Sequence, residues 1–303
     1  MSCIQANSLA EIDVSTLAGD DRILLCGESS SPLIEFAKAN ATHSATVVQT
    51  ADPVPAALRE SLRDLPSLLL SPFASSDVVV LTVANQKTAE ELSRHRRGQF
   101  KRTQTAELAV QLAGTGTLHH IHVEENPGTA ERFPELGPGH AIVSAELLLE
   151  ALSGAAEVRR LHGMNRQCVE AGILLLWDQL DACHEISQTM EGKGTPRTGD
   201  YWHEIMHRRE PDPGNAAYWV RRVGQHPAYG ILSSHLQEWL VEQKTPLEEM
   251  KCLRDAGLIG RPWDPHRMID LTQAALREPG APVESALRRV QYLEILNLLA
   301  FRS

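Results

Sequence analysis

The stretch YWHEIMHRREPDPGNAAYWVRRVGQHP, residues 201–227, does most to decide the fold of the second half of this chain. Asp200 is a good N-cap for a helix over 201–209, and Asn215 is a good N-cap for a helix over 216–223. The Pro-Asp-Pro-Gly run between them has the composition of a turn. The stretch also concentrates imidazole, guanidinium, carboxylate and aromatic groups, which are costly to bury without partners. We therefore expect two neighbouring helices that together build a polar site.

The rest of the C-terminal half continues the helical pattern. A Pro- and Gly-rich segment over 127–139 reads as a linker, and apolar residues with helical spacing follow it. The further helices expected there cover 145–152, 156–190 with an interruption near Gly163, 230–242, 246–256, 265–277 and 283–301. These segments predict an all-α helical domain over 140–303.

The N-terminal half has a different pattern, in which short apolar runs alternate with helical stretches. Strands are expected over 21–27, 45–49, 67–70, 78–83 and 117–123, and helices over 32–39, 55–62 and 86–113. Because the strands are almost continuously apolar, they suggest a sheet covered on both faces. The prediction for residues 1–135 is an α/β, Rossmann-like domain with a mainly parallel sheet.

Composition narrows the class of protein. The chain has 303 residues, of which 42% are hydrophobic and 22% charged, as in a globular protein of two domains. A formal charge of −10 argues against nucleic-acid binding but leaves room for a small anionic ligand. No apolar run is long enough for a membrane span. The five scattered cysteines, with no C-x-x-C pair, predict reduced thiols in a cytoplasmic protein. The oligomeric state is left undetermined.

Four residues form the strongest candidate metal site. His203, His207 and Glu210 share one face of the helix over 201–209 and its end, and His184 shares a face of the preceding helix with Asp181. If these faces meet, the imidazoles and a carboxylate supply the ligand set of a divalent transition metal. His203, His207 and Glu210 are then also candidate catalytic groups, through acid–base chemistry or a metal-activated water, as in a metal-dependent hydrolase.

His203-Glu204-x-x-His207 also matches the metalloprotease pattern H-E-x-x-H. In that interpretation both histidines bind zinc and Glu204 activates the water. A third ligand would come from downstream, with His226 and Glu238 as candidates. The five-residue pattern alone has low specificity, because many helices contain it by chance.

An anion-binding site without metal is the second interpretation. Arg208, Arg209 and Arg222 offer paired N–H donors to a carboxylate or phosphate. Asn215 and Tyr218 lie nearby in the sequence and add polar and aromatic surface. These five residues are candidate ligand-binding residues for a small anion.

A non-catalytic ligand-binding or scaffold protein is the third interpretation. In it the arginines pair with acids such as Asp178, Asp181, Glu210 or Asp212 and form a buried network that sets helix geometry. The residues leave all three interpretations open, and with them the question of whether the protein is an enzyme.

The motif W-H-x-I-M-H-R-R-E-x-D over 202–212, continued by N-x-x-Y-W-x-R-R-x-G-x-H-P over 215–227, resembles an uncharacterised bacterial protein family. The resemblance covers about 140–303 and implies no substrate. In that family a small residue often occupies the position of Glu204, which argues against an essential base there. The resemblance implies these site residues: His184, His203, His207, Arg208, Arg209, Glu210 and Asn215.

A second candidate site is the serine loop Gly27-Glu28-Ser29-Ser30-Ser31, between an expected strand and an expected helix. Backbone N–H groups at such a helix start favour an anion, so Ser29 and Ser30 are candidate ligand-binding residues. The loop resembles the phosphosugar-binding loops of sugar isomerase (SIS) domains, which implies a phosphorylated metabolite as ligand. The alternative is that the serines only cap the helix.

Overall fold

The computed structural model describes residues 54–63, 65, 67–70, 133–141, 143–154 and 158–301, together with three short strands. By contacts between residues, the chain divides into two compact units. Unit 1 comprises 1–53, 66–132 and 146–156, and unit 2 comprises 54–65, 133–145 and 157–303. The predicted boundary between 135 and 140 remains a prediction.

Unit 1 contains a small three-stranded sheet. Its strands are β1 (Leu25–Cys26), β2 (Thr46–Val48) and β3 (Val78–Val80), in the order β1-β2-β3. β1 and β2 are parallel and pair Leu25 with Val47, whereas β2 and β3 are antiparallel and pair Val47 with Val79. Its described helices are α3 (Ser67–Leu70) and α6 (Ala145–Gly154), which begins at the last residue of a unit 2 segment.

The prediction of an α/β, Rossmann-like N-terminal domain with a mainly parallel sheet is wrong. The described residues are overwhelmingly helical, the strands have only two or three residues, and one of the two strand pairings is antiparallel. The run over 67–70, expected as a strand, is helical. A short apolar run has no periodicity that separates a strand from a buried helix, and nothing in it sets strand direction. The segments 32–39, 86–113 and 117–123 lie outside the described residues.

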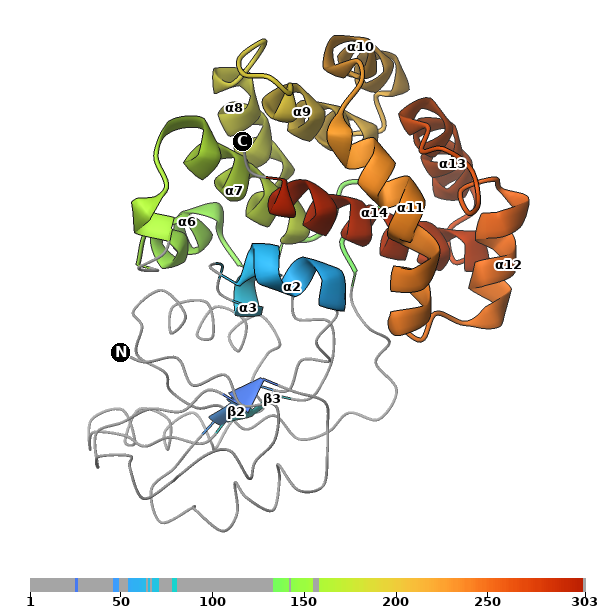
Figure 1. Ribbon diagram of the computed structural model, residues 1–303, viewed down its shortest axis with the longest axis horizontal. Helices are drawn as coiled ribbons and strands as arrows, with labels where there is room; N and C mark the ends of the chain where they lie inside the picture. Colours follow the sequence, from blue (N-terminus) through green and yellow to red (C-terminus); the bar gives the residue numbers. More distant parts are fainter. Residues whose placement is uncertain are drawn as a thin grey trace. The chain divides into compact units, whose positions relative to one another are not determined.

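Unit 2 is a bundle of helices (Figure 1). They are α2 (Ala56–Leu62), α7 (Gly163–Leu176), α8 (Leu180–Thr189), α9 (Thr198–Arg209), α10 (Pro213–Val223), α11 (Pro227–Glu242), α12 (Leu247–Asp255), α13 (Pro265–Arg277) and α14 (Pro282–Ala300), with a short 3-10 turn over Val158–Arg160. α14 packs against α2, α7, α11, α12 and α13, while α9 lies against α7, α8, α10 and α13. The predicted helical C-terminal region is therefore observed, and α9 occupies a central place in it.

The core of unit 2 depends on a close approach between α7 and α14. Val290, Leu293 and Leu296 of α14 are completely buried. Gly172 of α7 faces the same core, where a Cβ would lie 2.5 Å from the Leu299 side chain and 3.0 Å from the Trp202 ring. Any larger residue at 172 would push these helices apart, because a close-packed core does not absorb a misplaced methyl group.

Side-chain caps start several helices of unit 2. Asp212 accepts a hydrogen bond from the Asn215 N–H (3.0 Å) at the start of α10, where Pro213 is the first helical residue. Asp264 and Pro265 start α13 in the same way. The expected cap of α10 was Asn215, so the helix begins one turn earlier than predicted. Proline is favourable at a first helical position because its missing N–H would have no helical partner there.

The single helix expected over 156–190 is divided in two. α7 ends at Leu176, α8 begins at Leu180, and Asp178 between them has φ +61°. Few residues other than glycine adopt this left-handed conformation, although Asp does so more often than most. The break reorients α8 with respect to α7. Among the described helices, none has both the length and the apolar composition needed to cross a bilayer.

Candidate metal centre

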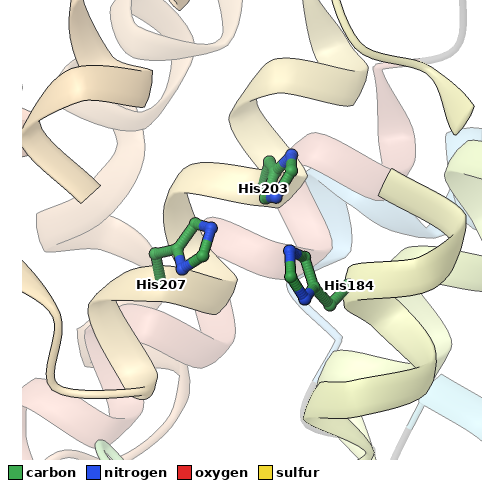
Figure 2. A group of neighbouring side chains, drawn as sticks. All are labelled: His184, His203 and His207. Carbon is green, nitrogen blue, oxygen red and sulfur yellow. The ribbon is translucent and has the colours of Figure 1, made fainter. Parts of the chain in front are cut away.

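Three histidines from two helices come together in unit 2 (Figure 2). His184 lies on α8, and His203 and His207 lie one turn apart on α9. One ring nitrogen of each histidine lies within 4.8 Å of the corresponding nitrogens of the other two. The His184 ring centroid is 4.8 Å from that of His203 and 5.0 Å from that of His207. We call these three residues the histidine cluster.

His203 has the most unusual environment of the three. Its side chain is buried, and neither ring nitrogen has a hydrogen-bond partner among the described residues. Burial, together with the neighbouring His207 and His184, lowers the pKa of His203 to about 3. Its imidazole is therefore neutral at pH 7 and carries a free lone pair. Leaving a buried polar group without a hydrogen-bond partner costs about 1–3 kcal/mol. A ligand bound to the His203 ring would remove that cost.

His207 is oriented by two polar neighbours. Its Nδ1 lies 2.8 Å from Oε2 of Glu210, and the Asn215 amide nitrogen lies 3.1 Å from its Nε2. Burial lowers the pKa of His207, although the Glu210 carboxylate opposes that shift. With Nδ1–H donating to Glu210, the Nε2 lone pair accepts a hydrogen bond from the Asn215 amide, which a ligand at Nε2 would displace. Glu210 thus contacts the ring rather than a shared ligand point, which makes it an outer carboxylate of the kind that orients metal-bound histidines.

Aromatic residues of α10 cover the cluster on one side. The Trp219 indole stacks on the His203 ring, with centroids 3.8 Å apart and planes 20° apart. The Arg222 guanidinium lies 5.0 Å from the Trp219 ring and 5.6 Å from the Tyr218 ring, and it donates a hydrogen bond to the Tyr218 hydroxyl (3.0 Å). Arg222 also pairs with Glu191 at 3.2 Å. The sequence analysis gave Tyr218 and Arg222 as ligand-binding candidates, and Trp219 belongs to the motif quoted there over 215–227.

Arg208 points into the bundle core. It donates hydrogen bonds to both carboxylate oxygens of Glu294 on α14, the shorter at 2.5 Å, and to Glu204 at 3.3 Å. Tyr201 donates a hydrogen bond to Glu294 as well (2.7 Å). Burial raises the pKa of Glu204 to about 8. Glu204 therefore belongs to this core network, where Arg208 is its hydrogen-bond partner, and this position does not favour Glu204 as the base that activates a water.

Arg209 is also completely buried and pairs with an acid. It donates hydrogen bonds to the Leu175 carbonyl oxygen at the end of α7 (2.6 Å) and to the Asp178 carboxylate. Asp178 was one of the acids expected to pair with the arginines. Neither Arg208 nor Arg209 contributes a group to the histidine cluster. Glu294, the main partner of Arg208, was missed by the sequence analysis because it lies 86 residues away in the chain.

The remaining candidates lie elsewhere. His226 is buried beside Thr198, to which it is hydrogen-bonded at 3.2 Å, and it also accepts the Ala228 N–H. Asp181 and Glu238 are exposed. Ser29 and Ser30 lie outside the described residues.

The cluster has the composition of a nitrogen-rich transition-metal site. Three imidazole ligands suit zinc, copper or nickel, whereas calcium and magnesium prefer oxygen ligands. Metal–nitrogen bonds of about 2 Å require nitrogens closer together than the 4.8 Å limit observed, so small ring rotations would accompany binding. With three protein ligands, a bound ion would keep an open position for a water or a substrate.

Comparison with known proteins identifies no relative. No family model, no curated protein and no solved structure matches this chain. The resemblance of the W-H-x-I-M-H-R-R-E-x-D motif to a bacterial family, and that of the serine loop to sugar isomerase domains, remain predictions.

Proposed function

We propose that unit 2 binds a divalent transition metal through His184, His203 and His207, with Glu210 orienting His207. The observation that supports this most is the buried His203 imidazole, which has no hydrogen-bond partner among the described residues and lies beside two further imidazoles. A bound ion would give the His203 ring the partner that it lacks, in place of the contacts that His184 makes with Gln188 and His207 with Asn215. The hydrogen bond from His207 to Glu210 has the arrangement that fixes tautomers in metal sites.

The proposed activity is metal-dependent hydrolysis. A divalent ion held by His184, His203 and His207 would keep its double positive charge, because imidazole ligands carry none, and it would supply the Lewis-acid activation of water that hydrolysis needs. Asn215, whose amide lies beside His207, would contact a group bound at the open position.

A small anion is the ligand class that this proposal favours. Arg208 and Arg209 are occupied by buried carboxylates, and Arg222 is shared among Glu191, Asp200 and Tyr218. An anion at this site would therefore bind mainly to the metal ion, whose charge the neutral imidazoles do not offset. The cytoplasmic location expected from the scattered cysteines is part of the same proposal.

Metal analysis of the purified chain tests the proposal. We expect about one equivalent of zinc or another late transition metal after purification without chelators, its loss in His203→Ala, and weaker binding in His184→Ala, which keeps two of the three ligands. His235→Ala is the matched control, because His235 is a half-exposed histidine on α11 whose Nδ1 contacts Glu238. A metal-free protein that also takes up no Zn²⁺ or Co²⁺ in a titration would contradict the proposal.

The competing function is a scaffold whose polar residues only set helix geometry. The fully buried pairs Arg208–Glu294 and Arg209–Asp178 favour it, because they join helices without facing the histidine cluster. If His203→Leu raises the melting temperature and the native chain takes up no metal, the scaffold interpretation is the better one.

A further inference from the structure

We infer that Arg209 is a positioning residue for His184, and this rests on the metal-binding function proposed above. Arg209 lies two residues after His207 at the end of α9, and its guanidinium contacts the break between α7 and α8. His184 lies on α8, six residues beyond Asp178. The Arg209 side chain therefore connects α9, which carries His203 and His207, to the break that sets the direction of α8 and so the position of His184.

The conformation of the break between α7 and α8 sets the direction in which α8 leaves α7. Asp178 adopts φ +61°, which is unfavourable for a residue with a Cβ. Its carboxylate accepts hydrogen bonds from Arg209 and from the Glu135 backbone N–H (3.1 Å). Gly139 packs so closely on the Asp178 side chain that a Cβ there would collide with it. These contacts fix the residue from which α8 departs.

Arg209 also restrains the end of α7. Its Nη1 donates to the Leu175 carbonyl oxygen in the last turn of α7, which also accepts a longer hydrogen bond (3.3 Å) from the Asp178 N–H at the break. The two donors of one planar guanidinium thus hold both sides of the break in a fixed relation. A lysine has one charged nitrogen and cannot reproduce this two-point geometry.

Energetics favour a geometric role over a stabilising one. The side chains of Arg209 and Asp178 are both almost completely inaccessible to solvent. Buried ion pairs contribute little net stability, because desolvation offsets their attraction, and apolar replacements are often as stable. The pair does supply a defined distance between α9 and the start of α8, which a three-ligand metal site requires.

Arg208 provides the matched comparison. It is equally buried, but its partners are Glu294 on α14, which carries no member of the histidine cluster, and Glu204 on α9 itself, so neither partner lies on α8 or at its start. A general loss of bundle rigidity would follow from a substitution at either arginine. A specific loss of His184 ligation would follow only at Arg209.

The test is a double-mutant cycle on Co²⁺ affinity and the visible Co²⁺ spectrum, using Arg209→Lys and His184→Ala. We expect Arg209→Lys to weaken Co²⁺ binding by about tenfold or more, to change the spectrum toward that of His184→Ala, and to have no further effect in the His184→Ala chain. Arg208→Lys is expected to leave the spectrum of bound Co²⁺ unchanged. Asp178→Asn, which suits the left-handed backbone, repeats the comparison if Arg209→Lys does not fold.

Three outcomes would overturn the inference. An unchanged affinity and spectrum in Arg209→Lys would do so, as would an equal loss with and without His184. If the native chain binds no Co²⁺ at all, the proposed metal function itself fails, and the inference fails with it. The first two outcomes leave the metal function standing, so the two failures are distinguishable.

Discussion

The imidazole of His203 lies flat against the indole of Trp219, with 3.8 Å between ring centroids. A metal ion bound to His203 would therefore be within a few ångströms of an indole that is only 5% exposed. Paramagnetic ions quench tryptophan fluorescence at such short range. The fluorescence of Trp219 should therefore report metal binding at His203.

Copper titration should quench a defined part of the tryptophan emission. We expect saturable quenching with one equivalent of Cu²⁺ in the native chain, and most of that change should disappear in Trp219→Phe, which keeps the stacked ring. Trp239, which stacks on the half-exposed His235 at 5.7 Å, serves as the comparison through Trp239→Phe. Equal quenching in both variants would argue that Cu²⁺ binds elsewhere.

Glu210 should control metal affinity without binding the metal. Its carboxylate orients His207 and raises the basicity of the ring, so Glu210→Gln is expected to weaken Zn²⁺ binding by about 10- to 100-fold, measured by competition with a chelating dye. The control is Glu238→Gln, because Glu238 makes the same contact with His235 on an exposed face. Comparable losses in the two variants would contradict the assigned role.

Acid should destabilise the metal-free protein through His203. Its folded pKa of about 3 is below the ordinary value of 6.5, so the unfolded chain binds the extra proton. The stability that comes from keeping the ring neutral is full above pH 6.5 and is lost as the pH falls toward 3. In His203→Leu we expect a shallower fall in the free energy of unfolding over that range, by a few kcal/mol at most. Urea titrations of the metal-free proteins at several pH values measure the free energy of unfolding. The prediction is refuted if that free energy depends on pH equally in His203→Leu and in the native chain.

Glu204 should give the opposite pH dependence. Two buried carboxylates, Glu204 and Glu294, share the guanidinium of Arg208, and the pKa of Glu204 rises to about 8. The folded protein therefore holds a proton that the unfolded chain releases near pH 4.5. This contribution to stability is full below pH 4.5 and is lost as the pH rises to 8.

Glu204→Gln keeps the shape of the protonated acid and removes its titration. Between pH 5 and 9 the melting temperature of this variant should fall less than that of the native chain, with the largest gain, of a few degrees, at the alkaline end. Thermal unfolding followed by circular dichroism measures the difference. A variant that is less stable than the native chain at pH 9 would show that Glu204 acts as a carboxylate in the folded state.

Local signals accounted for much of the helical half. The helix over 265–277 was predicted with the bounds observed, because Asp264 and Pro265 start it and the apolar spacing is regular. Periodicity also placed His203 and His207 on one face. The N-terminal sheet was not predictable in this way, because strand direction and pairing depend on residues far apart in the chain.

What the sequence by itself determined is therefore the identity of the helices and the face on which each imidazole lies, since both depend on interactions within one or two turns. Tertiary structure alone decided that α8 and α9 face each other at the histidine cluster. It also decided that α7 ends at the left-handed Asp178, where Arg209 binds it, and that Arg208 pairs with Glu294. These contacts join residues 31 and 86 positions apart, and only packing of the whole bundle brings such residues within hydrogen-bonding distance.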